Sequence, residues 1–112
     1  MANTFKNTGA ALTSSLTTYY TVPAATTSIV LLAQATNVDN SAAQAVTFCW
    51  YDLSGGTKFD MVKALSVPAN AAVGLIAGKL VLETGDYLQA SSTASSLIEL
   101  SLSVLELSLI HI

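Results

Sequence analysis

Alternation of apolar and polar residues with a period of two is the pattern that most limits how this chain can fold. It is clearest between Leu97 and Glu106, where Ile98, Leu100, Leu102 and Val104 alternate with Glu99, Ser101, Ser103 and Leu105. Side chains of a β-strand point alternately to opposite faces, whereas an α-helix repeats about every 3.6 residues. The segment therefore predicts a strand of an antiparallel sheet, with one buried apolar face and one mostly polar face.

Six further segments show strand character, and one is ambiguous between a short strand and a turn of helix. The six are Ser15 to Val22, Thr27 to Thr36, Ala45 to Leu53, Lys58 to Leu65, Val73 to Ile76 and Asp86 to Ser92, and the ambiguous one is Lys79 to Leu82. Thr27 to Thr36 is a nearly continuous apolar run, and its β-branched residues favour a buried strand. Ala45 to Leu53 has bulky side chains on both faces, so we expect it to be central in its sheet.

Turn residues separate these segments at short intervals. Ser54-Gly55-Gly56-Thr57 lies between two strand patterns and indicates a tight hairpin, because glycine adopts positive φ without steric cost. Other turns are indicated at Asn37 to Ser41, Val67 to Asn70 and Thr84 to Asp86. The predicted fold class is all-β: a single antiparallel β-sandwich or jelly roll of about seven to eight strands, with little or no helix.

One sandwich domain is expected over residues 15–106. Residues 1–14 are weakly patterned and are expected to form an N-terminal arm, which either adds a strand to a neighbour or is a disordered terminus. Residues 107–112 match the in-frame translation of a transposase adapter used in shotgun sequencing libraries. Our hypothesis is that they form a non-native tail; the alternative is that Leu107 to Ile110 prolong the last strand.

The chain carries few charges: 4 Lys, no Arg and 7 Asp or Glu among 112 residues, for a net charge of −3. This composition excludes intrinsic disorder, which needs high charge and low hydrophobicity, and it excludes nucleic-acid binding through a basic surface. A surface so poor in charge is expected to be covered by other subunits, and we expect a homo-oligomer. No signal peptide or membrane span is indicated, so we expect synthesis in a reducing cytoplasm and no membrane partner.

The sequence indicates no catalytic, cofactor-binding or metal-binding site, and we expect the protein not to be an enzyme. The single His, His111, lies in the doubtful tail, and the single Cys, Cys49, lies in a core-like strand. Acidic residues flank two of the turns, but their spacing does not resemble a Ca²⁺-binding loop. Gly74 to Lys79 lacks the spacing of a phosphate-binding loop.

Aromatic residues are the remaining candidates for ligand contact. Five of them could form a platform on which a sugar stacks: Tyr19, Tyr20, Trp50, Tyr51 and Tyr87. Aromatic side chains in strands more often belong to a core or an interface, because their large area dominates burial. Both interpretations stay open at this point.

Four segments in order resemble small virion proteins of tailed bacteriophages. They are Leu16 to Ala24 (LTTYYTVPA), Thr27 to Val30 (TSIV), Leu65 to Ala69 (LSVPA) and Gly78 to Leu88 (GKLVLETGDYL). An alternating strand, Ser101 to Glu106, follows them. The resemblance covers most of the chain, although each motif alone is common in β-sandwiches.

The resemblance implies a structural virion protein, made in the host bacterial cytoplasm, that decorates the head and stabilises the capsid lattice. Its partner would be the major capsid protein or another virion protein. The candidate partner-contact residues are Phe5, Lys6, Leu12, Tyr19, Tyr20 and Tyr87. The alternative is an adhesion module of a tail or head fibre that binds a host glycan. The sequence does not decide between head and tail.

Overall fold

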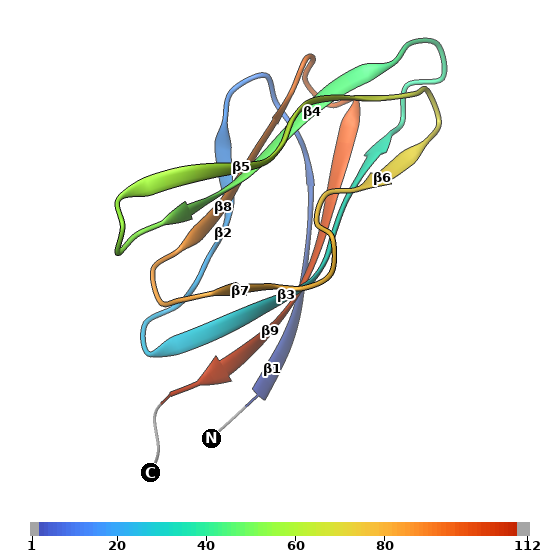
Figure 1. The fold of residues 1–112 in the computed structure, drawn as a ribbon. Helices are drawn as coiled ribbons and strands as arrows, with labels where there is room; N and C mark the ends of the chain where they lie inside the picture. The colour runs from blue at the N-terminus through green and yellow to red at the C-terminus, as the bar shows by residue number, and fades with distance from the viewer. Residues whose placement is uncertain (1–2, 110–112) are drawn as a thin grey trace.

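The computed structural model describes residues 3–109, which form nine strands in two antiparallel sheets packed face to face (Figure 1). The larger sheet has the order β1 (Asn3–Ala11), β9 (Ile98–Ser108), β3 (Thr26–Asn37) and β6 (Ala72–Gly74), and β7 (Leu80–Leu82) also pairs with β3. The smaller sheet has the order β2 (Thr17–Thr21), β8 (Tyr87–Ser92), β4 (Gln44–Asp52) and β5 (Thr57–Val67). The predicted all-β sandwich is confirmed, and no helix occurs among the described residues.

The strand that sequence patterning did not predict is β1, which lies within the expected N-terminal arm. It pairs with β9 along its whole length, from Asn3 opposite Leu107 to Ala11 opposite Glu99. In this structure the segment therefore adds an edge strand to its own sheet. Its weak patterning has a physical reason: most of its side chains are exposed, because an edge strand covers little of the core.

The alternation predicted for the last strand is confirmed. Ile98, Leu100, Leu102 and Val104 of β9 all face the space between the sheets and are at most 2% exposed. From the opposite sheet, β4 and β8 contribute buried apolar side chains that include Phe48 and Leu88. As expected, β4 is central, with β8 on one side and β5 on the other.

The prediction that the apolar run from Thr27 to Thr36 is buried holds for one face only. Leu31 and Leu32 of β3 are 37% and 41% exposed. The reason is an irregularity in the pairing of β3 with β9 between Val30 and Leu32, which inserts one extra residue into β3. Such a bulge turns two consecutive side chains outward and then restores the alternation.

The ends of the strands agree with the turn signals. The hairpin between β4 and β5 turns through Leu53–Gly56, and Gly56 adopts a φ of +66°. At the C-terminal end β9 continues to Ser108, and the backbone N–H of Leu109 donates to the carbonyl of Ala25. Residues 107–109 thus prolong the sheet, while 110–112, with His111, lie outside the described residues. Within the described chain no helix could cross a lipid bilayer.

Candidate functional site

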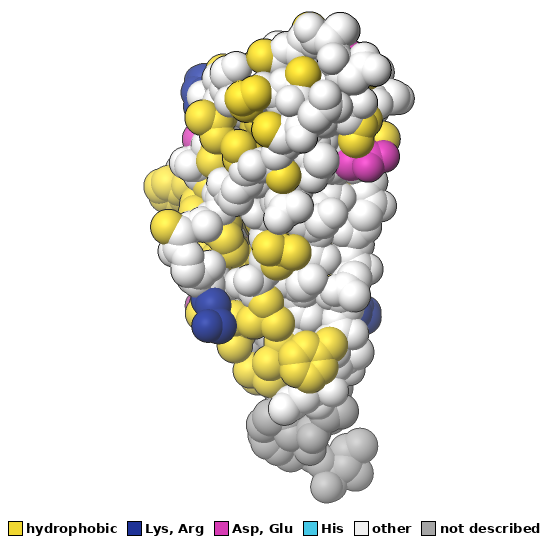
Figure 2. All heavy atoms as spheres, turned by 90° about the vertical axis from the view of Figure 1, so that its right-hand side faces the viewer, with side chains coloured by type: hydrophobic (Ala, Val, Ile, Leu, Met, Phe, Trp, Pro, Cys, Tyr) yellow, Lys and Arg dark blue, Asp and Glu magenta, His cyan; other side chains and the backbone are white. Residues whose placement is uncertain are grey.

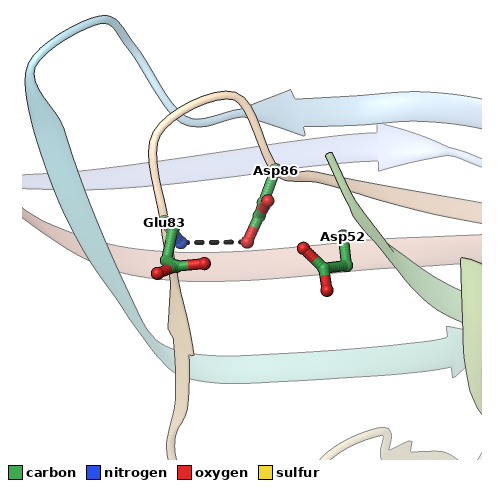
Figure 3. A group of neighbouring side chains, drawn as sticks. All are labelled: Asp52, Glu83 and Asp86. Atoms are coloured by element: carbon green, nitrogen blue, oxygen red, sulfur yellow. Dashed lines mark hydrogen bonds between the residues drawn. The ribbon is translucent and has the colours of Figure 1, made fainter. Parts of the chain in front are cut away.

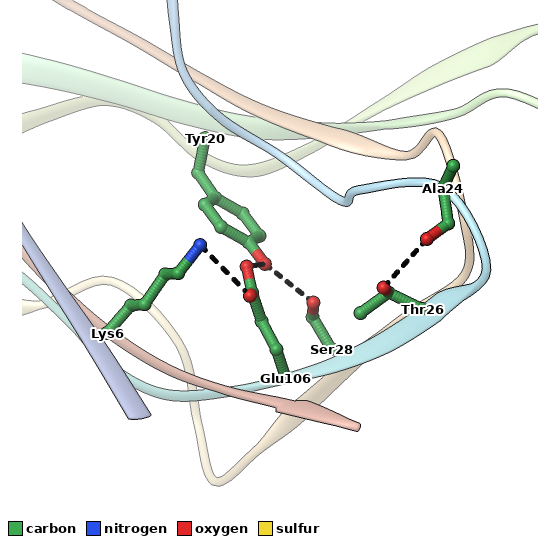
Figure 4. Close-up of polar contacts among 6 residues, drawn as sticks. All are labelled: Lys6, Tyr20, Ala24, Thr26, Ser28 and Glu106. Carbon is green, nitrogen blue, oxygen red and sulfur yellow. Dashed lines mark hydrogen bonds and ion pairs between the residues drawn. The ribbon is translucent and has the colours of Figure 1, made fainter. Parts of the chain in front are cut away.

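Glu106 is the one carboxylate that the β9 alternation directs into the space between the sheets. Because it follows Val104 by two residues, it occupies the next inward position of the strand, and its side chain is 10% exposed. Figure 4 shows three side chains from other strands that converge on it. We call these residues, Lys6, Tyr20, Ser28 and Glu106, the polar cluster.

Each carboxylate oxygen of Glu106 has its own partner in the polar cluster. Lys6 Nζ of β1 lies 3.1 Å from Oε1, and the Tyr20 hydroxyl of β2 donates to Oε2 across 2.6 Å. Since that hydroxyl has one proton to give, the Ser28 hydroxyl, 2.6 Å away, donates to the Tyr20 oxygen. The polar cluster therefore joins four strands and both sheets.

The electrostatic environment of Tyr20 keeps its hydroxyl protonated. Burial raises the pKa of Tyr20 far above its ordinary value, and the hydrogen bond to the Glu106 carboxylate raises it further. A phenol held neutral beside a carboxylate acts as a hydrogen-bond donor and not as a base. The arrangement suits a structural link between the sheets better than acid–base chemistry.

Sequence reasoning missed this cluster, although one signal pointed to it. Glu106 continues the inward positions of β9, and a carboxylate at such a position needs a charged or hydrogen-bonding partner. The identity of the partners was not readable, because Tyr20 lies 86 positions away in the chain.

A second group of carboxylates lies where the turn after β4 meets the turn between β7 and β8 (Figure 3). Oxygens of Asp52, Glu83 and Asp86 lie within 4.8 Å of one another. The Asp86 carboxylate is buried and accepts from two backbone N–H groups, those of Leu53 and Glu83, each at 3.0 Å. Its oxygens therefore fasten the two turns together.

The six candidate partner-contact residues do not form one surface. Phe5 is the most accessible, with 73% of its surface exposed, whereas Leu12 is fully buried in the core. Lys6 and Tyr20 belong to the polar cluster, and Tyr19 is partly buried against the core. Tyr87 stacks on Tyr51, with 4.8 Å between ring centroids.

The five aromatic residues considered as a sugar platform are also dispersed. Trp50 stacks on Phe59 at 5.3 Å, while its neighbour Tyr51 stacks on Tyr87. Since consecutive residues of a strand point to opposite faces, these two stacks lie on opposite sides of the smaller sheet. Cys49 is buried in the same strand, and burial raises the pKa of its thiol, so the thiol is poorly reactive.

An apolar row crosses the outer face of the larger sheet. Strand pairing places Phe5 of β1 opposite Leu105 of β9, Leu105 opposite Ile29 of β3, and Ile29 opposite Val81 of β7. We call these four residues the apolar row. Phe5 and Val81, at its two ends, are 73% and 60% exposed. Figure 2 shows apolar side chains along the whole length of the molecule, some of them close to the end that carries the termini.

Further along β1 and β9 the outer face is hollowed instead of bulky. An open hollow of about 340 Å³ is lined by Gly9, Ala10, Ala11, Glu99, Leu100 and Ser101. Gly9 is opposite Ser101 and Ala11 is opposite Glu99 in the strand pairing, so the absent or small side chains of Gly9, Ala11 and Ser101 leave the hollow open.

The smaller sheet exposes apolar side chains along its edge strand β5. Phe59, Met61 and Leu65 are all more than a third exposed. Charges accompany these apolar side chains, since Lys58 and Asp60 of the same strand form an ion pair at 3.7 Å.

No protein-family model matches the chain, and no curated protein matches it. Solved structures do match the chain. A protein of Bacillus endospore appendages, described as disulfide-linked pili, gives a TM-score of 0.58 at 13% identity over 97% of this chain and 88% of its own. A chain of infectious bursal disease virus, Gx strain, gives 0.52 at 9% identity, over 95% of this chain and 30% of its own. These likenesses show the fold.

Proposed function

We propose that this chain is a non-enzymatic structural subunit of a virion, which decorates the head of a tailed bacteriophage and stabilises the capsid lattice. The observation that carries the proposal is the apolar, charge-poor character of the surface. Large apolar side chains are exposed on both sheets of a domain with 11 charged residues among 112, counting 4 Lys and 7 Asp or Glu. Exposed apolar side chains on a surface with so few charges favour contact with other subunits.

The fold supports the same proposal. Two solved structures that resemble this chain come from disulfide-linked pili and from a virus. A sandwich of this size presents two broad faces and several strand edges to neighbours. Fold likeness alone does not assign a function, so the exposed side chains carry the argument.

The part of the surface proposed to bind the particle is the edge strand β5. Its exposed Phe59 is held by stacking on Trp50, so little side-chain freedom remains to be lost on binding. The β4–β5 hairpin projects from the body of the sandwich (Figure 1), where a neighbouring subunit can reach it. A subunit bound there stabilises the assembled lattice by mass action.

Quantitative mass spectrometry of purified particles tests the proposal. A decoration protein is present at a copy number close to that of the major capsid protein, whereas a fibre module is present in a few copies. We expect the first result. A few copies per particle, or absence from particles, would overturn head decoration.

Binding to particles that lack the protein tests the assigned surface. Phe59→Ser should weaken binding about tenfold or more, the usual cost of removing a central aromatic contact. Val38→Ser is the matched control, because Val38 is similarly exposed but lies in the loop after β3. Equal weakening by both variants would show that β5 is not the contact.

A further inference from the structure

The outer face of the larger sheet has a bulky end and a hollow end, on the same strands. At the bulky end Phe5 projects from β1 beside the rest of the apolar row. At the other end, Gly9 and Ala11 of β1 border the hollow. A projection and a hollow that share one face are the two halves of a self-complementary contact.

The bulky end and the hollow end lie at equal distances along β1 from a central residue, Asn7. Asn7 of β1 is opposite Ser103 of β9, and the Ser103 hydroxyl donates to the Asn7 side chain at 2.8 Å. Phe5 lies two residues before Asn7, and Gly9 lies two residues after it. A twofold axis between two such faces, crossing the strands at the level of Asn7, therefore brings Phe5 of one copy over Gly9 of the other.

Charge favours a second copy as the occupant of this face. β3 and β7 carry no charged residue, and Lys6 of β1 turns inward to Glu106. Of the two carboxylates on β9, Glu106 is buried, which leaves Glu99 at the rim of the hollow. Two copies of this face can approach with almost no like-charge repulsion.

The extent of the face also fits such a contact. Nine paired positions at about 3.4 Å per residue span roughly 30 Å, and four strands about 4.8 Å apart span roughly 19 Å. The product, roughly 600 Å² before side-chain relief is added, approaches the ~800 Å² that each partner of a standard stable interface buries.

We propose that two copies of this chain pack face to face through the larger sheet, with Phe5 of each copy in the hollow of the other. Sheets that pack in this way lie about 10 Å apart with their strands roughly aligned. The contact does not involve β5, so the dimer and the proposed particle binding use different surfaces of the molecule.

Sedimentation equilibrium of the purified protein tests the dimer with two variants of opposite design. Phe5→Ser removes the projection, and Gly9→Val fills the hollow. A Cβ at Gly9 meets only the Leu100 carbonyl oxygen at 3.9 Å, an ordinary contact, so the backbone leaves room for a side chain to start there. Each variant alone should raise the dimer Kd at least about tenfold. Leu65→Ser, on the other sheet, is the matched control and should leave the Kd unchanged.

The decisive measurement is the equimolar mixture of the two variants. In the mixed dimer the Phe5 of the Gly9→Val copy enters the unfilled hollow of the Phe5→Ser copy, and a serine faces the filled hollow. Association should therefore recover most of the way toward that of the unchanged protein.

Four results would overturn the proposal. They are a protein that stays monomeric up to its solubility limit, an assembly larger than a dimer, variants that associate as the unchanged protein does, and folded variants whose mixture does not recover. Thermal unfolding of each variant establishes that it is folded. Failure of the dimer would leave particle binding through β5 standing, and the reverse also holds.

Discussion

The space between the two sheets is filled in two different ways along its length. In the middle, Phe48 and Leu88 of the smaller sheet face Leu100 and Leu102 of the larger, and all are at most 2% exposed. Toward the termini, the polar cluster replaces this apolar packing with a carboxylate, a phenol, a hydroxyl and an ammonium. Strands β2, β3 and β9 contribute side chains to these two regions or lie beside them.

The difference between the two regions separates the stability of the fold from the specificity with which its sheets are aligned. Apolar packing stabilises in proportion to buried area but accepts many arrangements of similar volume. A buried carboxylate accepts only an arrangement that supplies its partners, because an unpaired charge costs several kcal/mol. We infer that the apolar middle holds the sheets together and that the polar cluster fixes how they are aligned.

The largest effect is expected in the apolar middle. Phe48→Ala removes a fully buried aromatic ring and should lower the free energy of unfolding by about 3–5 kcal/mol. Urea denaturation at neutral pH measures it. If Phe48→Ala lowers the free energy of unfolding no more than changes in the polar cluster do, the apolar middle is not the main source of stability.

A smaller loss is expected when the central carboxylate of the polar cluster is neutralised. Glu106→Gln keeps the shape but removes the charge that Lys6 and Tyr20 contact, so we expect a loss of about 1–3 kcal/mol. Glu99→Gln is the matched control, since Glu99 lies on the exposed face of the same strand, and it should cost less than about 0.5 kcal/mol. Equal costs would mean that the cluster contributes nothing specific.

Tyr20→Phe should cost about 1 kcal/mol at pH 7, and the cost should shrink at alkaline pH. The pKa of Tyr20 is raised in the folded protein above the value of 10.0 that holds when the chain is unfolded. Above pH 10 the unfolded chain therefore loses this proton first, and the unchanged protein loses stability by up to about 1.4 kcal/mol per pH unit. The phenylalanine variant has no such proton. Urea denaturation of both proteins at pH 7 and above pH 10 measures the gap, and a gap that widened with pH would contradict this account.

The smallest effect is expected for the lysine. The Lys6 side chain is 50% exposed, so its ion pair with Glu106 is partly screened by water. Lys6→Met should lower the free energy of unfolding by less than about 1 kcal/mol, and added salt should reduce the difference further. A salt-independent loss of 2 kcal/mol or more, by the same order-of-magnitude reasoning, would show that the pair is effectively buried.

The sequence predicted the apolar middle well and the polar cluster not at all. Strand alternation is local, so Leu100 and Leu102 identify their own buried face without knowledge of any partner. The partners of Glu106 come from β1 and β2, and nothing local indicates which distant residues will contact it. The acidic group at Asp52 and Asp86 was missed for the same reason, because it forms only when two separate turns are brought together.

Two other features escaped prediction for reasons of geometry. β1 has little hydrophobic signal, because an edge strand needs none to pair its backbone with β9. The bulge at Leu31 lies inside an apolar run, and one extra leucine does not change the pattern of such a run. The hairpin at Gly55 and Gly56 was predictable, because its chemistry lies within the turn itself.

The position of β9 in the larger sheet sets the order in which a newly made chain can acquire structure. The smaller sheet is complete once β8 has been synthesised, because all four of its strands lie between Thr17 and Ser92. β1 and β3 must both wait for β9, which inserts between them. Until it does, the nascent polypeptide exposes the apolar side of β3 and leaves β1 without a neighbour. A subunit released before β9 folds is thus open to pairing with other chains, and insertion of this one strand removes the unpaired edges.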